Sequence, residues 1–545
     1  MIKSSAKEII SLYETIKSDR DLYYGLWEDC RFYYDSEKQN QQPNNRGSKN
    51  TENYQPVNPV GYEASLAFAS GLFSHTYNPG DQFFTFKVAD NQIEDTDLME
   101  DWAVSASKTC LENLVSSNFG TVAYSMLLNY ARLNTGVIYQ EWNEEKGLVF
   151  KEIPVTNCCI AEDFDGYVDT LIREFELTAK QAYEKWGDDC HNETIKAAQD
   201  PKRASEKITY LHAVMPRESY KIDSYNKMDM PVKSCYVNKD KQHITEEGGY
   251  TTFPYAVPRV QKNNNTPYGR GMSFAALDTM RHISRLTADI DDGVEMAINP
   301  PLFYTGSMEE ESIDLTPGAV NHVSQMGEQP WAYPSNLDLN AADARETRKE
   351  EEIRKLFYNH VFALLDQERS ARNITATEID ARMAEKVQAL VPIVNRLFDE
   401  FYSMVLIRSL HILIENGEIE EPPEENIKNL RVEYSTKLDQ KLAILQDQQI
   451  LQALTEVQGV IAGLTEMPGL EHYVHIDRII KSLLRSKNIN PDYIKTEDET
   501  EDSKAAEAEA KQKMMQQQQF ADSIAPVDPN KAPEEGSIAD QMGQL

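Results

Sequence analysis

A long helical pattern that ends at a double proline is the feature that most restricts how this chain folds. The pattern begins near Ser273, which we expect to cap the helix, and it stops at Asn299-Pro300-Pro301. A helix of about 25 residues is about 37 Å long. Apolar residues recur along it every three or four positions and so share one face: Leu277, Met280, Ile283, Leu286, Ile290, Val294 and Ile298.

A non-helical insert and a second helical pattern follow this helix. The insert contains the short apolar run Leu302-Phe303-Tyr304 and the turn signal Pro317-Gly318, which predict short strands joined by turns. The second helical pattern runs from about Ala341 to Leu365. Two helices that flank a small β-containing insert predict a long helical hairpin with the insert at its tip.

The charge of this region is of one sign. Between Arg285 and Arg345 there is no Lys or Arg. Eleven acidic residues fall there: Asp289, Asp291, Asp292, Glu295, Glu309, Glu310, Glu311, Asp314, Glu328, Asp338 and Asp343. A single copy gains little from such a patch, because self-repulsion opposes compactness. The same patch repeated around a ring lines or rims a hole with negative potential.

Three motifs in this order resemble the head-to-tail connector, or portal, family of short-tailed (podovirus-type) bacteriophages. They are Tyr268-Gly269-Arg270-Gly271, Asn299-Pro300-Pro301, and Thr375-Ala376-Thr377-Glu378-Ile379 with Arg382. The resemblance covers about residues 5 to 490 and implies an α+β, mainly helical portal fold. The parts it implies are an α/β wing (1–266), a stem helix (267–298), a small β-containing clip (299–340), a second stem helix (341–365), a tunnel loop (366–374), a long kinked helix (375–416), a helical crown (417–491) and a low-complexity tail (492–545).

The resemblance also implies a function and partners. Family members form a ring, expected to have twelve subunits, at one capsid vertex of the virion after assembly in the host bacterial cytoplasm. Double-stranded DNA passes through the ring without sequence readout during packaging and ejection. The implied partners are the terminase large subunit, the tail adaptor and tail proteins, and the major capsid and scaffolding proteins. No enzymatic activity, cofactor or metal is implied.

Candidate site residues follow from the same comparison. In the tunnel loop, Arg369 and Arg372 either touch passing phosphates or form salt bridges with Asp366, Glu368 or a neighbouring subunit, and both interpretations stay open. Pro392 lies inside the long helical pattern and is expected to kink it. The acidic wall of stem and clip comprises Asp289, Asp292, Glu295, Glu309, Glu310 and Glu311.

The clip offers aromatic residues for docking. These are Phe303, Tyr304, Trp331 and Tyr333. They either bind terminase and the tail adaptor or pack between subunits. We favour packing between subunits for Phe303 and leave Trp331 open.

The sequence supports an enzymatic function less well than a structural one. No G-x-x-x-x-G-K-[ST] phosphate loop is present, so the chain is not expected to be the packaging ATPase. Asp289, Asp291, Asp292 and Glu295 resemble a nuclease cluster, but Asp291 and Asp292 face different directions on a helix, which favours a solvated acidic face. Tyr268-Gly269-Arg270-Gly271 is more typical of a turn before a helix than of an anion cradle. The main alternative function is a tail adaptor or scaffolding protein that contacts the portal without forming the channel.

Composition agrees with a conduit. The formal net charge of −34 should repel DNA on average, so a polyanion can slide past, although acidity also keeps a large protein soluble. The six cysteines have no CxxC spacing, which argues against a metal site or a disulfide framework. No apolar run is long enough to predict a membrane span.

Residues 136–260 show a β pattern. The aromatic residues Phe83, Phe84 and Phe86 are expected in the hydrophobic core.

Overall fold

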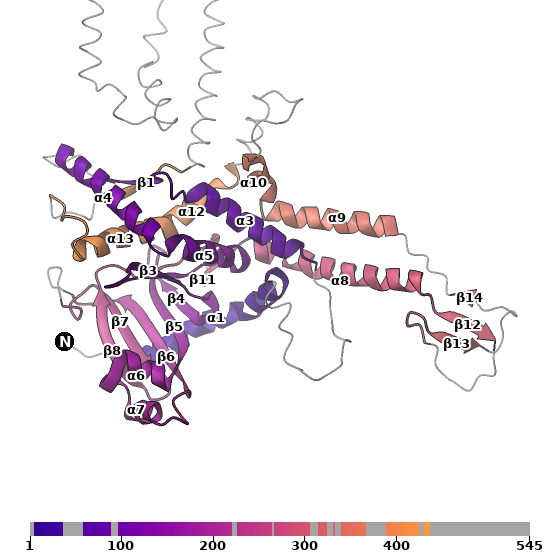
Figure 1. The fold of residues 1–545 in the computed structure, drawn as a ribbon, viewed down its shortest axis with the longest axis horizontal. Coiled ribbons are helices and arrows are strands. Elements are labelled where there is room, and N and C mark those ends of the chain that lie inside the picture. Colours follow the sequence, from indigo (N-terminus) through magenta and orange to yellow (C-terminus); the bar gives the residue numbers. More distant parts are fainter. Residues whose placement is uncertain are drawn as a thin grey trace, which may run out of the picture. The chain divides into compact units, whose positions relative to one another are not determined.

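The computed structural model describes residues 5–35, 58–88, 96–220, 226–263, 266–305, 314–323, 331–332, 339–366, 388–423 and 430–436. The chain divides into two compact units, residues 1–445 and 446–545, and all described residues lie in the first. The fold is α+β and mainly helical, as the sequence predicts (Figure 1).

The N-terminal helices supply much of the core. The sequence suggests two helices before residue 35, but the structure has one continuous helix, α1 (Ala6–Tyr34). Its buried positions recur along its whole length, because one apolar face runs from Ile9 to Tyr34. The next helices are α3 (Val60–Thr76), α4 (Thr96–Ser116) and α5 (Phe119–Leu133).

Residues 138–270 form the β-rich part, which agrees with the predicted pattern. A three-stranded sheet has the order β3-β2-β9, and a two-stranded ribbon pairs β10 with β11. A five-stranded antiparallel sheet has the order β4-β5-β6-β7-β8. The bounds are β2 Ile138–Asn143, β3 Gly147–Glu152, β4 Cys158–Glu162, β5 Val168–Thr178, β6 Lys207–Pro216, β7 Val232–Asn238, β8 His243–Tyr250, β9 Tyr255–Ala256, β10 Gln261–Asn263 and β11 Thr266–Arg270, with two short 3-10 helices at Val155–Asn157 and Gly187–Asp189.

Helices cover both faces of the five-stranded sheet. The start of α1 packs Tyr13 against Leu211 and its neighbours on one face. On the other face Trp186 of α6 (Ala179–Trp186) packs against Tyr210 and Cys190, next to α7 (Asn192–Gln199). Because Tyr210 and Leu211 are adjacent in β6, they point to opposite faces, which explains why both are buried.

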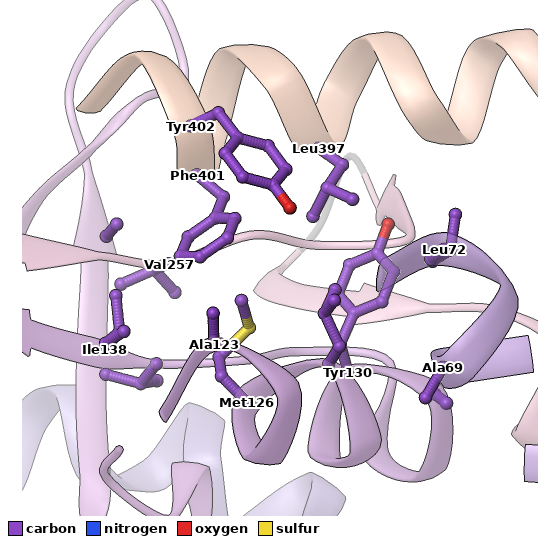
Figure 2. Packing of buried hydrophobic residues seen from close by; sticks show 14 of the residues in the cluster. Ala69, Leu72, Ala123, Met126, Tyr130, Ile138, Val257, Leu397, Phe401 and Tyr402 are labelled. Carbon is purple, nitrogen blue, oxygen red and sulfur yellow. The ribbon is translucent and has the colours of Figure 1, made fainter. Parts of the chain in front are cut away.

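The main hydrophobic core joins the N-terminal helices to a helix near residue 400. Figure 2 shows Met126 and Tyr130 of α5 beneath Leu397, Phe401 and Tyr402. The aromatic residues Phe83, Phe84 and Phe86 are all buried in this cluster, as predicted. All six cysteines are buried free thiols.

One strand lies where the sequence analysis places the crown. β15 (Leu430–Tyr434) pairs antiparallel with β1 (Phe84–Val88), and Phe84 lies opposite Tyr434. The predicted crown range 417–491 therefore begins with residues that belong to the N-terminal core. The alternation of apolar and charged residues in Leu430-Arg431-Val432-Glu433-Tyr434 was an overlooked strand signal. The helices predicted after residue 436 lie outside the described residues.

The predicted second stem helix is two helices. α9 (Leu339–Leu356) ends before Tyr358, and α10 (Asn359–Asp366) follows it. Tyr358 has a φ of 56°, a left-handed conformation that ends an α-helix. The break lets Phe357 and Val361 both enter the core.

The helical pattern is interrupted by a turn at residues 389–390, between Gln388 and Pro392. Pro392 lies in the first turn of α12 (Val391–Leu397), where its missing N–H costs no helical hydrogen bond. A π-helical turn, η4 (Phe398–Tyr402), and α13 (Ser403–Glu415) continue the helix. Residues 375–387 of the predicted long helix lie outside the described part of the chain.

Stability should depend on pH through a buried histidine. His212 lies between Tyr255, whose hydroxyl is 2.7 Å from Nδ1, and Ser234, whose hydroxyl is 3.0 Å from Nε2. Burial, with Lys185 and Arg173 nearby, lowers the pKa of His212 well below its ordinary 6.5. The folded chain therefore keeps this ring neutral, whereas the unfolded chain binds a proton below about pH 6.5.

We expect the free energy of unfolding to fall as the pH drops below about 6.5, with His212 contributing up to about 1.4 kcal/mol per pH unit. Urea unfolding at several pH values measures this slope. His212→Gln should flatten it, and His282→Gln, at an exposed position on a helix, should not. An unchanged slope in His212→Gln would contradict the assignment.

Candidate functional site

The candidate site is the pair of helices that flank the insert, together with the small sheet between them (Figure 1). The first helix is α8 (Met272–Ile298), and its end before Asn299-Pro300-Pro301 confirms the predicted stop. The insert contains β12 (Leu302–Thr305), β13 (Val320–Val323) and β14 (Trp331–Ala332). α9 packs against α8 on the return.

Two glycines at the end of β11, Gly269 and Gly271, set the start of α8. The Gly269 N–H donates to the Thr135 hydroxyl at 2.9 Å, and a Cβ at Gly269 would overlap the carbonyl oxygen of Asn134. The Tyr268 hydroxyl donates to the Cys158 carbonyl at 3.1 Å. The predicted turn before the helix is thus the end of strand β11, followed directly by Gly271 and α8. These contacts fix the strand end against its neighbours, which favours a structural role over an anion cradle.

Ser273 is not the cap of α8. The helix begins at Met272 with Gly271 in the N-cap position. Ser273 lies inside the first turn, where it is buried, and its carbonyl accepts a hydrogen bond from Tyr34 at 2.8 Å. The glycine takes the cap position because the chain passes close to Val260 and Asn134, with no room for a side chain.

The two halves of α8 differ in burial. Ala276, Leu277, Met280 and Ile283 are buried in the main core. After Ser284 no residue of α8 is buried, and Ile298 is 79 % exposed. The apolar stripe of the outer half thus has no core of its own within one copy.

A buried asparagine fastens the middle of α8 to α9. Asn58 precedes α3, and its Nδ2 donates to Glu346 at 2.9 Å and to Glu350 at 3.2 Å. The Thr287 hydroxyl donates to the same Glu346 carboxylate at 2.6 Å. The Asn58 side-chain oxygen accepts from the Val60 N–H at 3.0 Å. One amide group is therefore shared by two carboxylates of α9, of which Glu346 also accepts from Thr287 and Glu350 also pairs with Arg354.

Asn58→Asp should destabilise this junction. The substitution replaces the shared donor by a third carboxylate beside Glu346 and Glu350, so we expect a loss of about 2–3 kcal/mol in the free energy of unfolding near pH 7. The deficit should shrink at lower pH, where the added carboxyl binds a proton. Urea unfolding near pH 7 and pH 5 measures both effects.

Asn143→Asp is the matched control. Its Oδ1 only accepts, from the N–H groups of Glu145 and Lys146 at 3.0 Å each, so a carboxylate serves equally well. We expect a change within about 0.5 kcal/mol. Equal losses in the two variants would show that the Asn58 amide has no special role.

The predicted acidic residues of α8 all lie on its surface. Asp289, Asp292 and Glu295 are exposed, as is Asp291. Within the described ranges, no three His, Cys, Asp or Glu side chains gather in an arrangement suited to a metal ion.

The small sheet presents apolar side chains to solvent. β12 pairs parallel with β13, with Leu302 opposite Val320, and antiparallel with β14. Leu302 is 41 % and Val320 is 56 % exposed, whereas Phe303 is only 5 % exposed. Phe303, for which we favoured packing between subunits, is therefore already buried in one copy. The exposed apolar residues near it are Ile298, Leu302, Leu315 and Val320.

Several predicted site residues cannot be placed. Arg369, Arg372 and Tyr333 lie outside the described residues, as do the three acidic residues Glu309, Glu310 and Glu311. Tyr304 belongs to β12 and Trp331 to β14, which fixes their backbone positions.

Sequence reasoning missed a buried arginine. Arg259 is 1 % exposed and binds Glu400 of η4, Glu162 of β4 and the Gly166 carbonyl. It thus joins the β-rich part to the helix that follows the candidate tunnel loop. No local pattern marks it, because the partners lie about 100 or more residues away.

No helix in the described part of the chain is long and apolar enough to cross a membrane.

Comparisons with known proteins agree with one another. The sequence model of the family described as "Bacteriophage head to tail connecting protein" matches residues 6–494. The chain is 23 % identical over 453 residues to the "Probable portal protein" of Bordetella phage BPP-1, which covers 80 % of each chain. It is 23 % identical over 532 residues to the "Portal protein" of Salmonella phage epsilon15, which covers 94 % of each chain.

A solved structure, "Virion of native gene transfer agent (GTA) particle", contains a chain that aligns with 76 % of this one at 10 % identity. The alignment covers 88 % of that chain with a TM-score of 0.33, which is too low to support a structural argument.

Proposed function

Because this chain belongs to the bacteriophage head to tail connecting protein family, we propose that it is the portal subunit of a phage virion. Twelve copies form a ring at one capsid vertex. Double-stranded DNA passes through the ring during packaging and ejection. The names of the two relatives, both portal proteins, support this proposal.

The observation that carries the proposal is the incomplete burial of α8. Its outer half, from Arg285 to Ile298, has no buried residue in one copy, although apolar residues continue along it. Leu286, Ile290 and Val294 are half-buried, and Ile298 is exposed. A long helix whose apolar stripe is only partly covered is stable in water when other copies complete the cover. Neighbouring subunits in a ring provide that cover.

The charge of the chain fits a channel through which DNA slides. Residues 286–344 contain no Lys or Arg, so a ring of these segments has few points that hold phosphates. DNA is then passed without sequence readout, since specificity needs contacts to base edges. A separate motor supplies the free energy, and we assign no catalytic step or cofactor to this subunit.

We assign the parts of the subunit as follows. α8 and α9 form the stem, and the sheet β12–β14 belongs to the clip. Residues 1–266 form the wing, to which β15 is added because it pairs with β1. The tunnel loop (366–374), the crown and the tail keep the roles that the family resemblance implies.

The clip is the proposed docking surface for the terminase large subunit during packaging and for the tail adaptor afterwards. Its exposed apolar residues Leu302, Leu315 and Val320 support a contact surface at this end. The alternative function is a tail adaptor or scaffolding protein. Neither alternative needs the order of helix, small sheet and helix that α8, β12–β14 and α9 have.

Negative-stain microscopy of the purified chain tests the proposal. We expect rings with a central hole wide enough for duplex DNA. Rods or small globules without a hole at any protein concentration would contradict a portal and favour an adaptor or a scaffold.

The tunnel-loop arginines make a second test. If Arg369 and Arg372 touch passing phosphates, replacing both by Ala should reduce the length of packaged DNA or its retention, because each lost contact weakens the grip on the backbone. The measurement is the length of DNA in purified particles. Arg203→Ala is the control, because Arg203 pairs with Glu206 on the surface. Unchanged packaging and retention would remove the phosphate role.

A further inference from the structure

One side of α8 faces away from α9 and carries three charges in a row. The two helices meet where Thr287 binds Glu346. Successive helix residues turn by about 100°, so Arg285 and Asp289 point about 160° away from Thr287, and Asp292 about 140°. All three are exposed. They form the outer stripe of α8, on the side opposite α9.

The side of α9 that faces away from α8 carries charges as well. Counting from Glu346 in the same way, Arg348 points about 160° away, Glu351 about 140° and Arg345 about 100°. These three residues are exposed and form the outer stripe of α9. The pair of helices therefore has one charged stripe on each of its two opposite sides.

Along the stem, the charges of the α8 stripe are opposite in sign, position by position, to those of the α9 stripe. α8 leaves the core after Ile283, and α9 returns to it at Ile353, so the helices run in opposite directions. Read outward from the core, the α8 stripe is positive, negative, negative: Arg285, Asp289 and Asp292. Read in the same direction, the α9 stripe is negative, positive, positive: Glu351, Arg348 and Arg345.

The spacings match too. The α8 charges are four and three residues apart, which is about 6 Å and 4.5 Å along the helix. The α9 charges are three and three residues apart, about 4.5 Å each. With Thr287 level with Glu346, the members of the three pairs lie about 4.5, 6 and 6 Å apart along the stem. A shift of about 5 Å between two copies therefore brings each charge next to one of opposite sign, and long side chains span the remainder.

These stripes are unpaired in one copy. Other charges of α9 have partners within the chain, Lys349 with Glu352 and Arg354 with Glu350 and Glu63. Among the described residues, no ion pair involves a member of either stripe. Ion pairs within the chain therefore account for Lys349, Glu350, Glu352 and Arg354 of α9, and leave all six stripe residues available to a neighbour.

We propose that the outer stripe of α8 in one copy binds the outer stripe of α9 in the next copy around the ring. The pairs are Arg285 with Glu351, Asp289 with Arg348, and Asp292 with Arg345, one residue of each pair from each copy. A ring needs two different, complementary patches on opposite sides of the subunit, which is what the stripes provide. Rotation about the ring axis repeats the same offset at every interface, so a stem inclined to that axis gives the required shift, and the same three pairs, between all neighbours.

The inference rests on the proposed ring and deepens it. Asp289 and Asp292 then lie between subunits rather than on the wall of the central channel. The other acidic residues of the segment 286–344 supply the negative charge of the channel. Ion pairs at an interface mainly set register and exclude wrong partners. The stripes therefore select the head-to-tail arrangement, because two α8 stripes or two α9 stripes placed together would repel.

Two charge reversals test the pairing. One variant carries Asp289→Arg with Asp292→Arg, and the other carries Arg345→Glu with Arg348→Glu. Each reversal places like charges between identical copies, so we expect at least tenfold fewer rings in mass photometry and negative-stain images. Mixing the two variants in equal amounts should restore rings, because alternating copies again bring opposite charges together.

The control is Glu144→Arg with Glu145→Arg, two exposed residues of the turn between β2 and β3, which changes the net charge by the same amount as the α8 reversal. It should form rings as the wild type does. The far-UV circular dichroism of each isolated variant should match the wild type, since all substituted residues are exposed.

Three results would overturn the inference. Rings that form normally from either reversed variant would show that the stripes are not paired, while the portal proposal would stand. Loss of rings in both variants without recovery on mixing would show that the substitutions act by another route. Absence of rings in the wild type would contradict the portal proposal itself.

Discussion

Arg259→Met should cost about 3–5 kcal/mol in the free energy of unfolding, the largest effect expected from any single substitution discussed. All five N–H groups of the guanidinium have partners. Nε donates to Glu400 at 3.2 Å, and Nη2 donates to Glu400 at 2.7 Å and to the Gly166 carbonyl at 3.1 Å. Nη1 donates to Glu162 and, at 3.2 Å, to the Pro267 carbonyl.

The cost arises from what the substitution leaves behind. Methionine fills a similar volume but donates nothing, so the Glu400 side chain, which is 10 % exposed, stays charged in a buried place without its main partner. The hairpin between β4 and β5 also loses its link to η4. Arg259→Lys should recover only part of the loss, since an ammonium has three donors and no planar fork.

Urea unfolding followed by circular dichroism measures the loss, and Arg203→Ala is its control. Arg203 forms a similar pair with Glu206, but both side chains are about half exposed, so we expect less than about 1 kcal/mol. In Arg259→Met with Glu400→Gln, part of the stability should return, because the buried charge is gone. Equal stability of Arg259→Met and the wild type would show that burial, not the ion pairs, holds this junction.

Gly269→Val should be the second most damaging change, with an expected loss of about 3 kcal/mol or more. Any Cβ at this position overlaps the carbonyl oxygen of Asn134 and presses on Arg259 and Thr135. A backbone carbonyl cannot rotate away as a side chain does, so β11 must move from its neighbours. The start of α8 moves with it, because the helix begins three residues later at Met272.

Thermal unfolding and ring formation in negative stain both report this effect. Gly25→Ala is the matched control, since nothing lies within 4 Å of a Cβ at Gly25 in the middle of α1. Alanine is the better helix former, so this control should gain about 0.5–1 kcal/mol. A Gly269→Val chain with an unchanged melting temperature and normal rings would contradict the close packing of this strand end.

Local signals predicted most of the elements but not their partners. Periodicity located α8 and the strands of the β-rich part, because side-chain spacing reflects which face is buried. The proline pair at residues 300–301 ended α8 as expected. The alternation in residues 430–434 is a local signal for the strand β15, but its partner, β1, lies about 345 residues away, so only the pairing shows that it packs with the N-terminal core.

The candidate site divides in the same way. The acidic stretch between Arg285 and Arg345 is visible in the sequence, and so is the apolar stripe of α8. Which charges face a neighbour depends on where α9 touches α8, and only the contact between Thr287 and Glu346 gives that direction. The tunnel-loop arginines at positions 369 and 372 stay predictions.

By itself, the sequence determined the helix that ends at Ile298, the β-rich block before it and the one-sign charge of residues 286–344, because each depends on neighbours along the chain. Only the tertiary structure decided that Tyr358 breaks the second helix, that Pro392 lies in the first turn of α12, and that Arg259 joins the β4–β5 hairpin to η4. Those outcomes depend on burial and on hydrogen-bond partners far away in the chain, which local spacing does not encode.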